Sequence, residues 1–112
     1  MKYYDEERMR RVRATLESDI LNWPGVASKE MMGCLCYFRG KRFFAFLITD
    51  GVVVTKLAKE DRAALSQTAK SKPFEMAGRT ASSWVQCALK GPADLRPLMP
   101  YIRKSYDAAA GR

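Results

Sequence analysis

The 112-residue sequence has no histidine, only three cysteines and no long apolar run. Without histidine the chain lacks the side chain that most often acts as a general base near neutral pH. An odd number of cysteines, two of them in a C-x-C pair, is not typical of a disulfide framework. No apolar run approaches the roughly 20 residues that a membrane-spanning helix needs. We therefore expect no membrane partner and no histidine-dependent catalysis.

The composition is that of a folded protein with an excess of positive charge. Hydrophobic residues make up 47% and charged residues 29%, which indicates one globular domain spanning residues 1–112. The formal net charge of +8 would attract polyanions, but it is spread in ones and twos along the chain. The first eleven residues, MKYYDEERMRR, are charged and do not resemble a signal peptide. We expect a cytoplasmic protein.

The three cysteines support several interpretations. Cys34 and Cys36 alternate with Leu35, so in a strand both thiols project from the same face. Together with Cys87 they could reach a soft metal ion, but zinc usually takes four ligands and no histidine completes the set. We predict no metal site and no cofactor, and we favour small core residues. Reactive or regulatory thiols at Cys34, Cys36 and Cys87 are the alternative.

A helix is predicted near the start of the chain, over about residues 5–22. Met9, Val12, Leu16 and Ile20 recur at spacings of three and four, which builds one apolar stripe. The segment Trp23-Pro24-Gly25 then ends the helix, because a proline disfavours helical geometry in the residue before it.

Three strands with two apolar faces are predicted next, over about residues 29–38, 42–49 and 52–57. Their turns are Arg39-Gly40-Lys41 and Asp50-Gly51, the second being a strong hairpin signal. In the middle strand the alternation places Phe44, Phe46 and Ile48 on one face and Phe43, Ala45 and Leu47 on the other. Such a meander must be covered on both sides, by the chain's own helices or by a second copy.

The rest of the chain completes an α+β domain of order α-β-β-β-α-β-β-α. Asp94 is the expected cap of the last helix, and Pro100 should kink that helix or delay its regular part. The predicted elements are a helix over about 59–70, strands over about 74–77 and 83–89, and a helix over about 94–109.

Several ordered motifs resemble the TfoX amino-terminal domain family, which is named for bacterial competence regulators. The likeness covers about residues 8 to 110. Its parts are Met31-Met32-Gly33-Cys34, Phe38-Arg39-Gly40-Lys41, Asp50-Gly51, Leu57-Ala58-Lys59-Glu60-Asp61-Arg62, Pro73-Phe74, Met76-Ala77-Gly78-Arg79 before Trp84-Val85, and Leu95-Arg96-Pro97-Leu98 with the aromatic-alanine end of the last helix.

This resemblance implies a fold like that of secretion chaperones and YgaC-like proteins, with helices packed against a curved antiparallel sheet. It implies no catalytic residues, because the family is not known as an enzyme family. The chain departs from the family at Met32, where an aromatic residue is common, and at Cys34, where a second glycine is common. The likeness covers only the amino-terminal domain of the regulators, so a role in competence is not carried over.

Two groups of basic residues are candidate binding sites. Arg79 follows Gly78 and lies close to Thr80, Ser82 and Ser83, a pattern that suits a carboxylate or phosphate. Lys56 is the second candidate for such an anion. Arg39, Lys41 and Arg42 at the hairpin turn, beside the aromatic residues Tyr37, Phe38 and Phe43, suit nucleic acid. Surface ion pairing of Arg79 and a simply solvated turn are the respective alternatives.

The expected function is a non-enzymatic binding or regulatory module acting through protein–protein association. The doubly apolar sheet predicts a homodimer, because an apolar patch left uncovered by three modest helices would normally be an interface. Other protein partners are unknown from the sequence. A nucleic-acid-binding accessory protein is the first alternative, and a small enzyme is the second.

Overall fold

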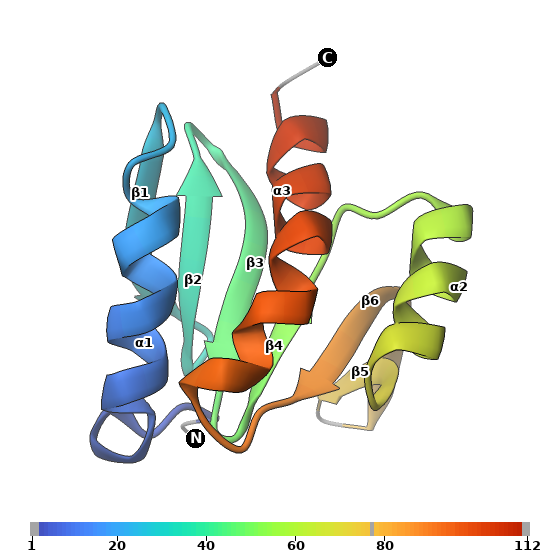
Figure 1. The fold of residues 1–112 in the computed structure, drawn as a ribbon, viewed down its shortest axis with the longest axis horizontal. Helices are drawn as coiled ribbons and strands as arrows, with labels where there is room; N and C mark the ends of the chain where they lie inside the picture. The colour runs from blue at the N-terminus through green and yellow to red at the C-terminus, as the bar shows by residue number, and fades with distance from the viewer. Residues whose placement is uncertain (1–2, 77, 111–112) are drawn as a thin grey trace.

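The fold is an α+β domain with one open six-stranded antiparallel sheet (Figure 1). The computed structural model describes residues 3–76 and 78–110. The strand order in the sheet is β1-β2-β3-β4-β6-β5. The elements are α1 (Glu6–Ile20), β1 (Val26–Met31), β2 (Cys34–Arg39), β3 (Arg42–Ile48), β4 (Gly51–Val54), α2 (Lys59–Thr68), β5 (Ser71–Met76), β6 (Arg79–Ala88), a 3₁₀ helix η1 (Pro92–Leu98) and α3 (Met99–Ala108).

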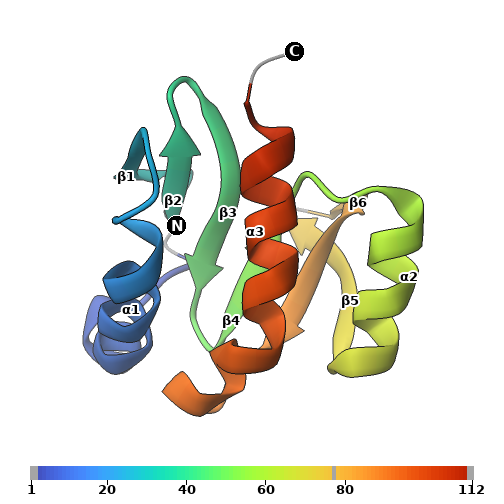
Figure 2. The ribbon, with the colours of Figure 1, turned by 45° about the horizontal axis from the view of Figure 1, so that its top comes forward.

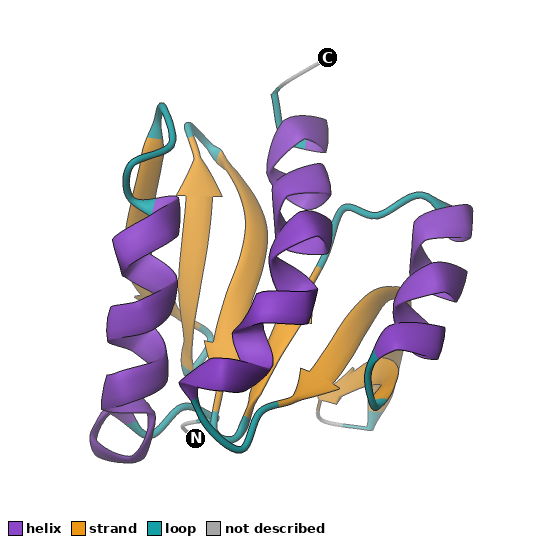
Figure 3. Ribbon diagram, viewed as in Figure 1, coloured by secondary structure: helices purple, strands orange, loops and turns teal. Residues whose placement is uncertain are grey.

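All the helices lie on one face of the sheet (Figure 3), and the view of Figure 2 shows the same layer from another angle. The main core lies between this helical layer and the sheet. It contains residues of every helix, among them Leu16 of α1, Leu65 of α2, Leu95 of η1 and Ile102 of α3. A second cluster of buried residues lies on the opposite face and contains no helical residue. The sheet is therefore apolar on both faces, and the helices cover only one.

The first helix matches its predicted stripe. Met9, Val12, Leu16 and Ile20 are all buried against the sheet. Asp5 caps the helix by accepting a hydrogen bond from the backbone N–H of Arg8 at 3.2 Å. The helix ends at Ile20, two residues before its predicted end.

A buried tyrosine anchors α1 to the sheet. The hydroxyl of Tyr37, on β2, donates a hydrogen bond of 2.8 Å to Oε2 of Glu17, which also accepts from Nε of Arg13 at 2.8 Å. Burial and this hydrogen bond raise the pKa of Tyr37 well above its ordinary value. The phenol is therefore neutral and acts as a donor.

A bulge in β3 changes which side chains face which layer. Tyr37 pairs with Ala45 and Phe38 pairs with Phe43, so Phe44 is the extra residue of the bulge. Phe44 and Ala45 both belong to the main core, whereas Phe43 packs with the second cluster. The predicted alternation, with Phe44 on the face of Phe46 and Phe43 on the face of Leu47, is therefore wrong at this end of the strand.

Ser105 of α3 binds the backbone at this bulge. Its hydroxyl donates a hydrogen bond of 2.5 Å to the carbonyl oxygen of Phe44 and accepts one of 3.0 Å from the backbone N–H of Lys56. The side chain is completely buried. One serine thus satisfies two backbone groups at the point where the strand ladder is interrupted.

The predicted strand over residues 29–38 is two strands, β1 and β2, joined by a tight turn. Met31 pairs with Cys34, so Met32 and Gly33 form a two-residue hairpin loop. Both have positive φ, 57° and 77°, as a type I′ turn requires. Methionine seldom adopts this conformation, which is why the alternation of apolar residues did not reveal the turn.

The second predicted turn is shifted by one residue. Ile48 pairs with Gly51, so the loop consists of Thr49 and Asp50, and only Asp50 has positive φ. Gly51 belongs to β4. A Cβ atom there would lie 3.0 Å from the carbonyl oxygen of Cys87, so this glycine allows β4 and β6 to approach closely.

The second half of the chain follows the predicted order with different boundaries. The strands predicted over 74–77 and 83–89 are longer and form the β5–β6 hairpin, while residue 77 lies outside the described residues. The last predicted helix divides into η1 and α3. Because α3 begins at Met99, Pro100 occupies its first turn, where proline is tolerated. Asp94 does not cap this helix, since its carboxylate accepts a hydrogen bond from the backbone of Lys90.

Among the helices of residues 3–76 and 78–110, none is long and apolar enough to cross a membrane.

Replacing Ser105 by alanine should destabilise the protein by about 1–3 kcal/mol, because the backbone N–H of Lys56 loses its partner and the carbonyl of Phe44 keeps only the 3.3 Å hydrogen bond from the N–H of Thr55. Urea unfolding followed by circular dichroism measures the change. Ser66→Ala is the matched control, since Ser66 is an exposed helical serine that bonds only to a carbonyl of its own helix. The control should shift stability by no more than about 0.5 kcal/mol. Equal effects of the two substitutions would contradict the role given to Ser105.

Candidate interaction surface on the second face of the sheet

The face of the sheet opposite the helices carries a cluster of apolar side chains, here called the second-face cluster. All six strands contribute to it, and Tyr3 adds one side chain from the segment before α1. Its buried members are Cys34, Cys36, Phe46, Ile48, Val53 and Phe74, and its half-buried members are Tyr3, Met31, Phe38, Phe43 and Trp84.

Aromatic rings form the centre of this cluster. Trp84 lies 5.4 Å from Phe43, 5.7 Å from Phe46 and 6.1 Å from Phe74, measured between ring centroids. Phe46 contacts Phe74 at 5.1 Å with nearly perpendicular rings, and Phe38 contacts Phe43 at 6.0 Å. Such edge-to-face pairs add about 0.5–1.5 kcal/mol each beyond the area they bury. The rings therefore form a packed layer rather than a set of loose side chains.

An irregularity in the β5–β6 hairpin brings two of these rings into the cluster. Pro73 pairs with Val85, but the next residue, Phe74, pairs with Ala81, so residues 82–84 lie between the two pairs. This change of register interrupts the period-two alternation of a regular strand. Phe74 and Trp84 then pack on Phe46 of β3.

The cluster is only partly closed by the chain itself. The side chains beneath, such as Cys36 and Val53, are completely buried, whereas Phe38, Phe43 and Trp84 are half-buried at the surface. These three aromatic rings, together with the half-buried Tyr3, are thus in contact with solvent on a face that carries no helix. This face is the strongest candidate for a binding surface among the described residues.

Lysines lie around this aromatic centre. Side chains of residues paired across neighbouring strands lie on the same face of the sheet. Lys29 is paired with Cys36, a member of the second-face cluster. Lys72 is paired with Gln86, which is paired in turn with Val53 of that cluster, so both lysines lie on the second face. They occupy β1 and β5, the two edges of the sheet. Nζ of Lys56 lies 5.4 Å from the ring centroid of Phe43. The surface therefore has an apolar centre and a basic rim.

The edges of the sheet do not favour pairing with another strand. The edge strand β1 carries the exposed, charged residues Lys29 and Glu30, and the edge strand β5 carries Lys72 and Pro73. Charges and proline on an edge strand oppose edge-to-edge association. Binding through the face of the sheet is favoured over extension of the sheet.

The three cysteines lie on opposite faces of the sheet. Cys34 and Cys36 belong to the second-face cluster, whereas Cys87 belongs to the main core beneath the helices. The three thiols therefore do not converge on a shared metal ion. The pKa of each thiol is raised to about 11, by burial in all three cases and, for Cys34, also by the neighbouring Cys36.

The basic residues of the β2–β3 turn differ in their surroundings. Arg39 is half-buried, with Cζ 4.2 Å from the ring centroid of Tyr106 and a 3.2 Å hydrogen bond to that residue's carbonyl oxygen. Arg39 therefore fastens the hairpin to α3. Lys41 and Arg42 are exposed at the turn, close in sequence to Phe38 and Phe43 of the second-face cluster.

The two anion candidates are not brought together by any observed contact. Arg79 is exposed at the start of β6, where its neighbour Thr80 donates a 3.3 Å hydrogen bond to Glu75. Lys56 lies over the ring of Phe43. Each remains a single basic side chain near a different part of the surface.

Sequence reasoning missed Phe74 and Trp84 as members of this surface. The sequence pattern predicts two short separate strands for them, and no local signal shows that the hairpin changes register at residues 73 and 74. The sequence offers Phe43 as a stacking candidate, but the predicted alternation places it on the face of Ala45 and Leu47, which the structure buries in the main core. The lysine at position 29 carried no distinguishing signal of its own.

No family model, no curated protein and no solved structure matches this chain. The resemblance to TfoX amino-terminal domains therefore stays a prediction from the motifs.

Cys34, Cys36 and Cys87 should all be unreactive toward an aromatic disulfide reagent in the folded protein at pH 8. With a pKa of about 11, roughly one thiol in a thousand is ionised at that pH, and burial blocks access as well. Absorbance should show slow labelling of the native protein and rapid labelling of three thiols in urea. Ser82→Cys, at an exposed position of β6, is the positive control and should react at once. Fast labelling of a native cysteine would show that the second face or the main core opens.

Proposed function

We propose that this chain is a non-enzymatic protein-association module that forms a homodimer through the second-face cluster. The observation that carries the proposal is the one-sided helical layer: every helix packs on the main core, and the aromatic centre of the opposite face keeps three half-buried rings at its surface. We further expect the module to be regulatory and cytoplasmic, as the resemblance to TfoX amino-terminal domains implies.

The layout of the face suits a protein interface. Protein interfaces combine an apolar, aromatic centre with a polar rim, and here Phe43 and Trp84 lie between edge strands that carry Lys29 and Lys72. An interface of ordinary size buries about 800 Å² per partner, which is roughly an eighth of the 6775 Å² surface of the chain. Two sheets packed face to face would place the rings at the centre and the lysines at the periphery.

The basic rim predicts how the affinity of such a dimer depends on salt concentration. Two copies bring lysines of the same sign toward each other, and their repulsion is screened by salt within about 8 Å at physiological ionic strength. The homodimer should therefore become tighter as salt is added. An acidic partner or a nucleic acid would show the opposite dependence, because its attraction to the lysines is screened.

Nucleic-acid binding is the second candidate function. It is favoured by the exposed Lys41 and Arg42 at the turn from β2 to β3, close in sequence to the half-buried Phe38 and Phe43. Bases stack on such rings while basic side chains follow the phosphates. Binding of single-stranded oligonucleotides that weakens steeply with salt would support this candidate and not the homodimer.

Light scattering during size exclusion should give about twice the 12.7 kDa chain mass at concentrations of about 100 µM. Phe43→Lys should weaken the dimer at least about tenfold, because it places a charge at the centre of the apolar face. Trp84→Lys is the second variant, used if the first one fails to fold. The chain offers a matched control in Leu21→Lys, since Leu21 is 45% exposed beyond the end of α1 and outside the second-face cluster.

The control variant should dimerise as the natural sequence does, and raising the salt concentration should shift the equilibrium toward the dimer. A mass of 12.7 kDa at every concentration, or a dimer equally disturbed by Leu21→Lys, would reject the proposal.

A further inference from the structure

We propose that the groove between α1 and η1 binds a small zwitterion, a free amino acid or a dipeptide, with its ammonium group at Asp19 and its carboxylate at Arg96. This site belongs to the helical layer and does not involve the second-face cluster. It is independent of the proposed homodimer.

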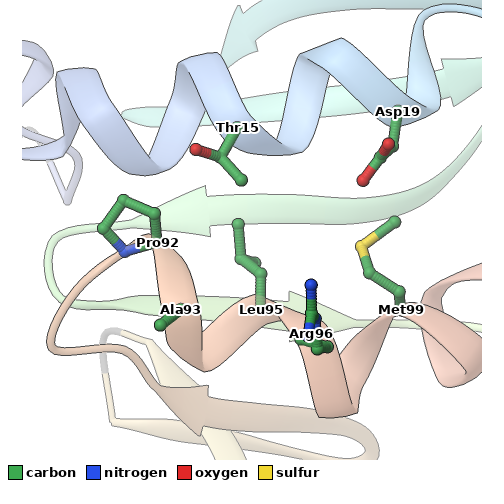
Figure 4. A pocket seen from close by; sticks show the side chains of 7 residues that line it. All are labelled: Thr15, Asp19, Pro92, Ala93, Leu95, Arg96 and Met99. Atoms are coloured by element: carbon green, nitrogen blue, oxygen red, sulfur yellow. The ribbon is translucent and has the colours of Figure 1, made fainter.

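The groove has the size of a ligand site. Its volume is about 600 Å³, within the usual range for small-molecule pockets. Thr15 and Asp19 of α1 form one wall, and Leu95, Arg96 and Met99 form the other (Figure 4). In this view the carboxylate of Asp19 points from α1 toward η1, and the side chains of Leu95 and Met99 point toward α1. Polar and apolar groups thus converge on one space.

The two charged groups of the groove have opposite signs and do not pair. Neither the carboxylate of Asp19 nor the guanidinium of Arg96 makes a hydrogen bond or an ion pair with any described residue. Elsewhere on α1, by contrast, Arg8 pairs with Asp50 and Arg13 pairs with Glu6 and Glu17. A molecule with one positive and one negative group satisfies both free charges at once, which neither a simple anion nor a simple cation does.

The end of α1 adds a second reason for a cation at Asp19. Asp19 lies in the last turn of the helix, which contains no basic residue. The carbonyl groups at a helix C-terminus carry partial negative charge, so a carboxylate there is unfavourable and a cation is favoured. An ammonium group next to Asp19 would compensate both the side chain and the helix end.

The apolar residues of the wall opposite α1 define the rest of the ligand. Leu95 is buried and Met99 and Pro92 are half-buried, so an apolar body can lie over them between the two charged ends. Thr15 presents an exposed hydroxyl on the same wall as Asp19. The chemistry is that of an amino acid or dipeptide with an aliphatic or thioether side chain.

The test is calorimetric titration of the purified protein with the twenty amino acids and a set of aliphatic dipeptides. For each amino acid or dipeptide that binds, the N-acetylated form lacks the ammonium charge and the C-amidated form lacks the carboxylate charge. Each of these two modifications, called caps below, should weaken binding about 10- to 100-fold. In the Arg96→Gln variant, amidation of the ligand should not weaken binding further, because the partner of the carboxylate is gone. In the Asp19→Asn variant, acetylation should not weaken binding further, because the partner of the ammonium group is gone. Comparing amino acids with dipeptides identifies which of the two the groove takes.

Arg10→Gln is the control variant, because Arg10 is exposed on α1 and does not line the groove. It should leave both the affinity and the effects of the two caps unchanged. The proposal is overturned if no zwitterion binds with a Kd below about 10 mM, or if capped ligands bind as well as free ones. It is also overturned if amidation still weakens binding to Arg96→Gln and acetylation still weakens binding to Asp19→Asn. None of these results bears on the oligomeric state.

Discussion

The structure depends on an unequal covering of one sheet. Leu16, Leu65 and Ile102, from three helices, bury one face, whereas among the described residues the other face is covered by side chains of the strands and by Tyr3. A sheet apolar on both faces loses its hydrophobic stabilisation wherever rings remain in water. The second face limits this loss by packing its rings around Trp84, with Phe43 and Phe46 in edge-to-face contact with it. The remaining contact with solvent is at the half-buried members of that cluster, including Phe43 and Trp84 at its aromatic centre, and this is the surface on which we place the proposed interface.

The bulge in β3 links the two faces. It places Phe44 among the helices, where it contacts Tyr106 at 5.4 Å, and leaves Phe43 free to pack on Trp84 at 5.4 Å. Ser105 of α3 holds the backbone of the bulge from the helical side. Packing of the last helix therefore helps to determine which aromatic ring the protein presents on its opposite face.

The sequence predicts the α+β class, the order of most elements and the apolar stripe of α1, because these follow from local periodicity. It misses the turn at Met32 and Gly33, because methionine seldom adopts the positive φ that this turn requires. It also misplaces the residues around Gly51, whose close approach to Cys87 depends on β6, a strand distant in sequence.

The candidate site is less predictable still, because Phe74 and Trp84 reach it only through a change of register in another hairpin. Similarly, Arg39 resembles a free binding residue in the sequence, but its role is decided by Tyr106 on the last helix.

The most direct test of the account is an isotope-filtered NOE experiment on an equal mixture of labelled and unlabelled protein. The account predicts contacts between copies that involve the ring protons of Phe43 and Trp84, which lie at the surface of the uncovered face. A spectrum without contacts between copies, or with contacts only to side chains of the helical layer, would contradict it.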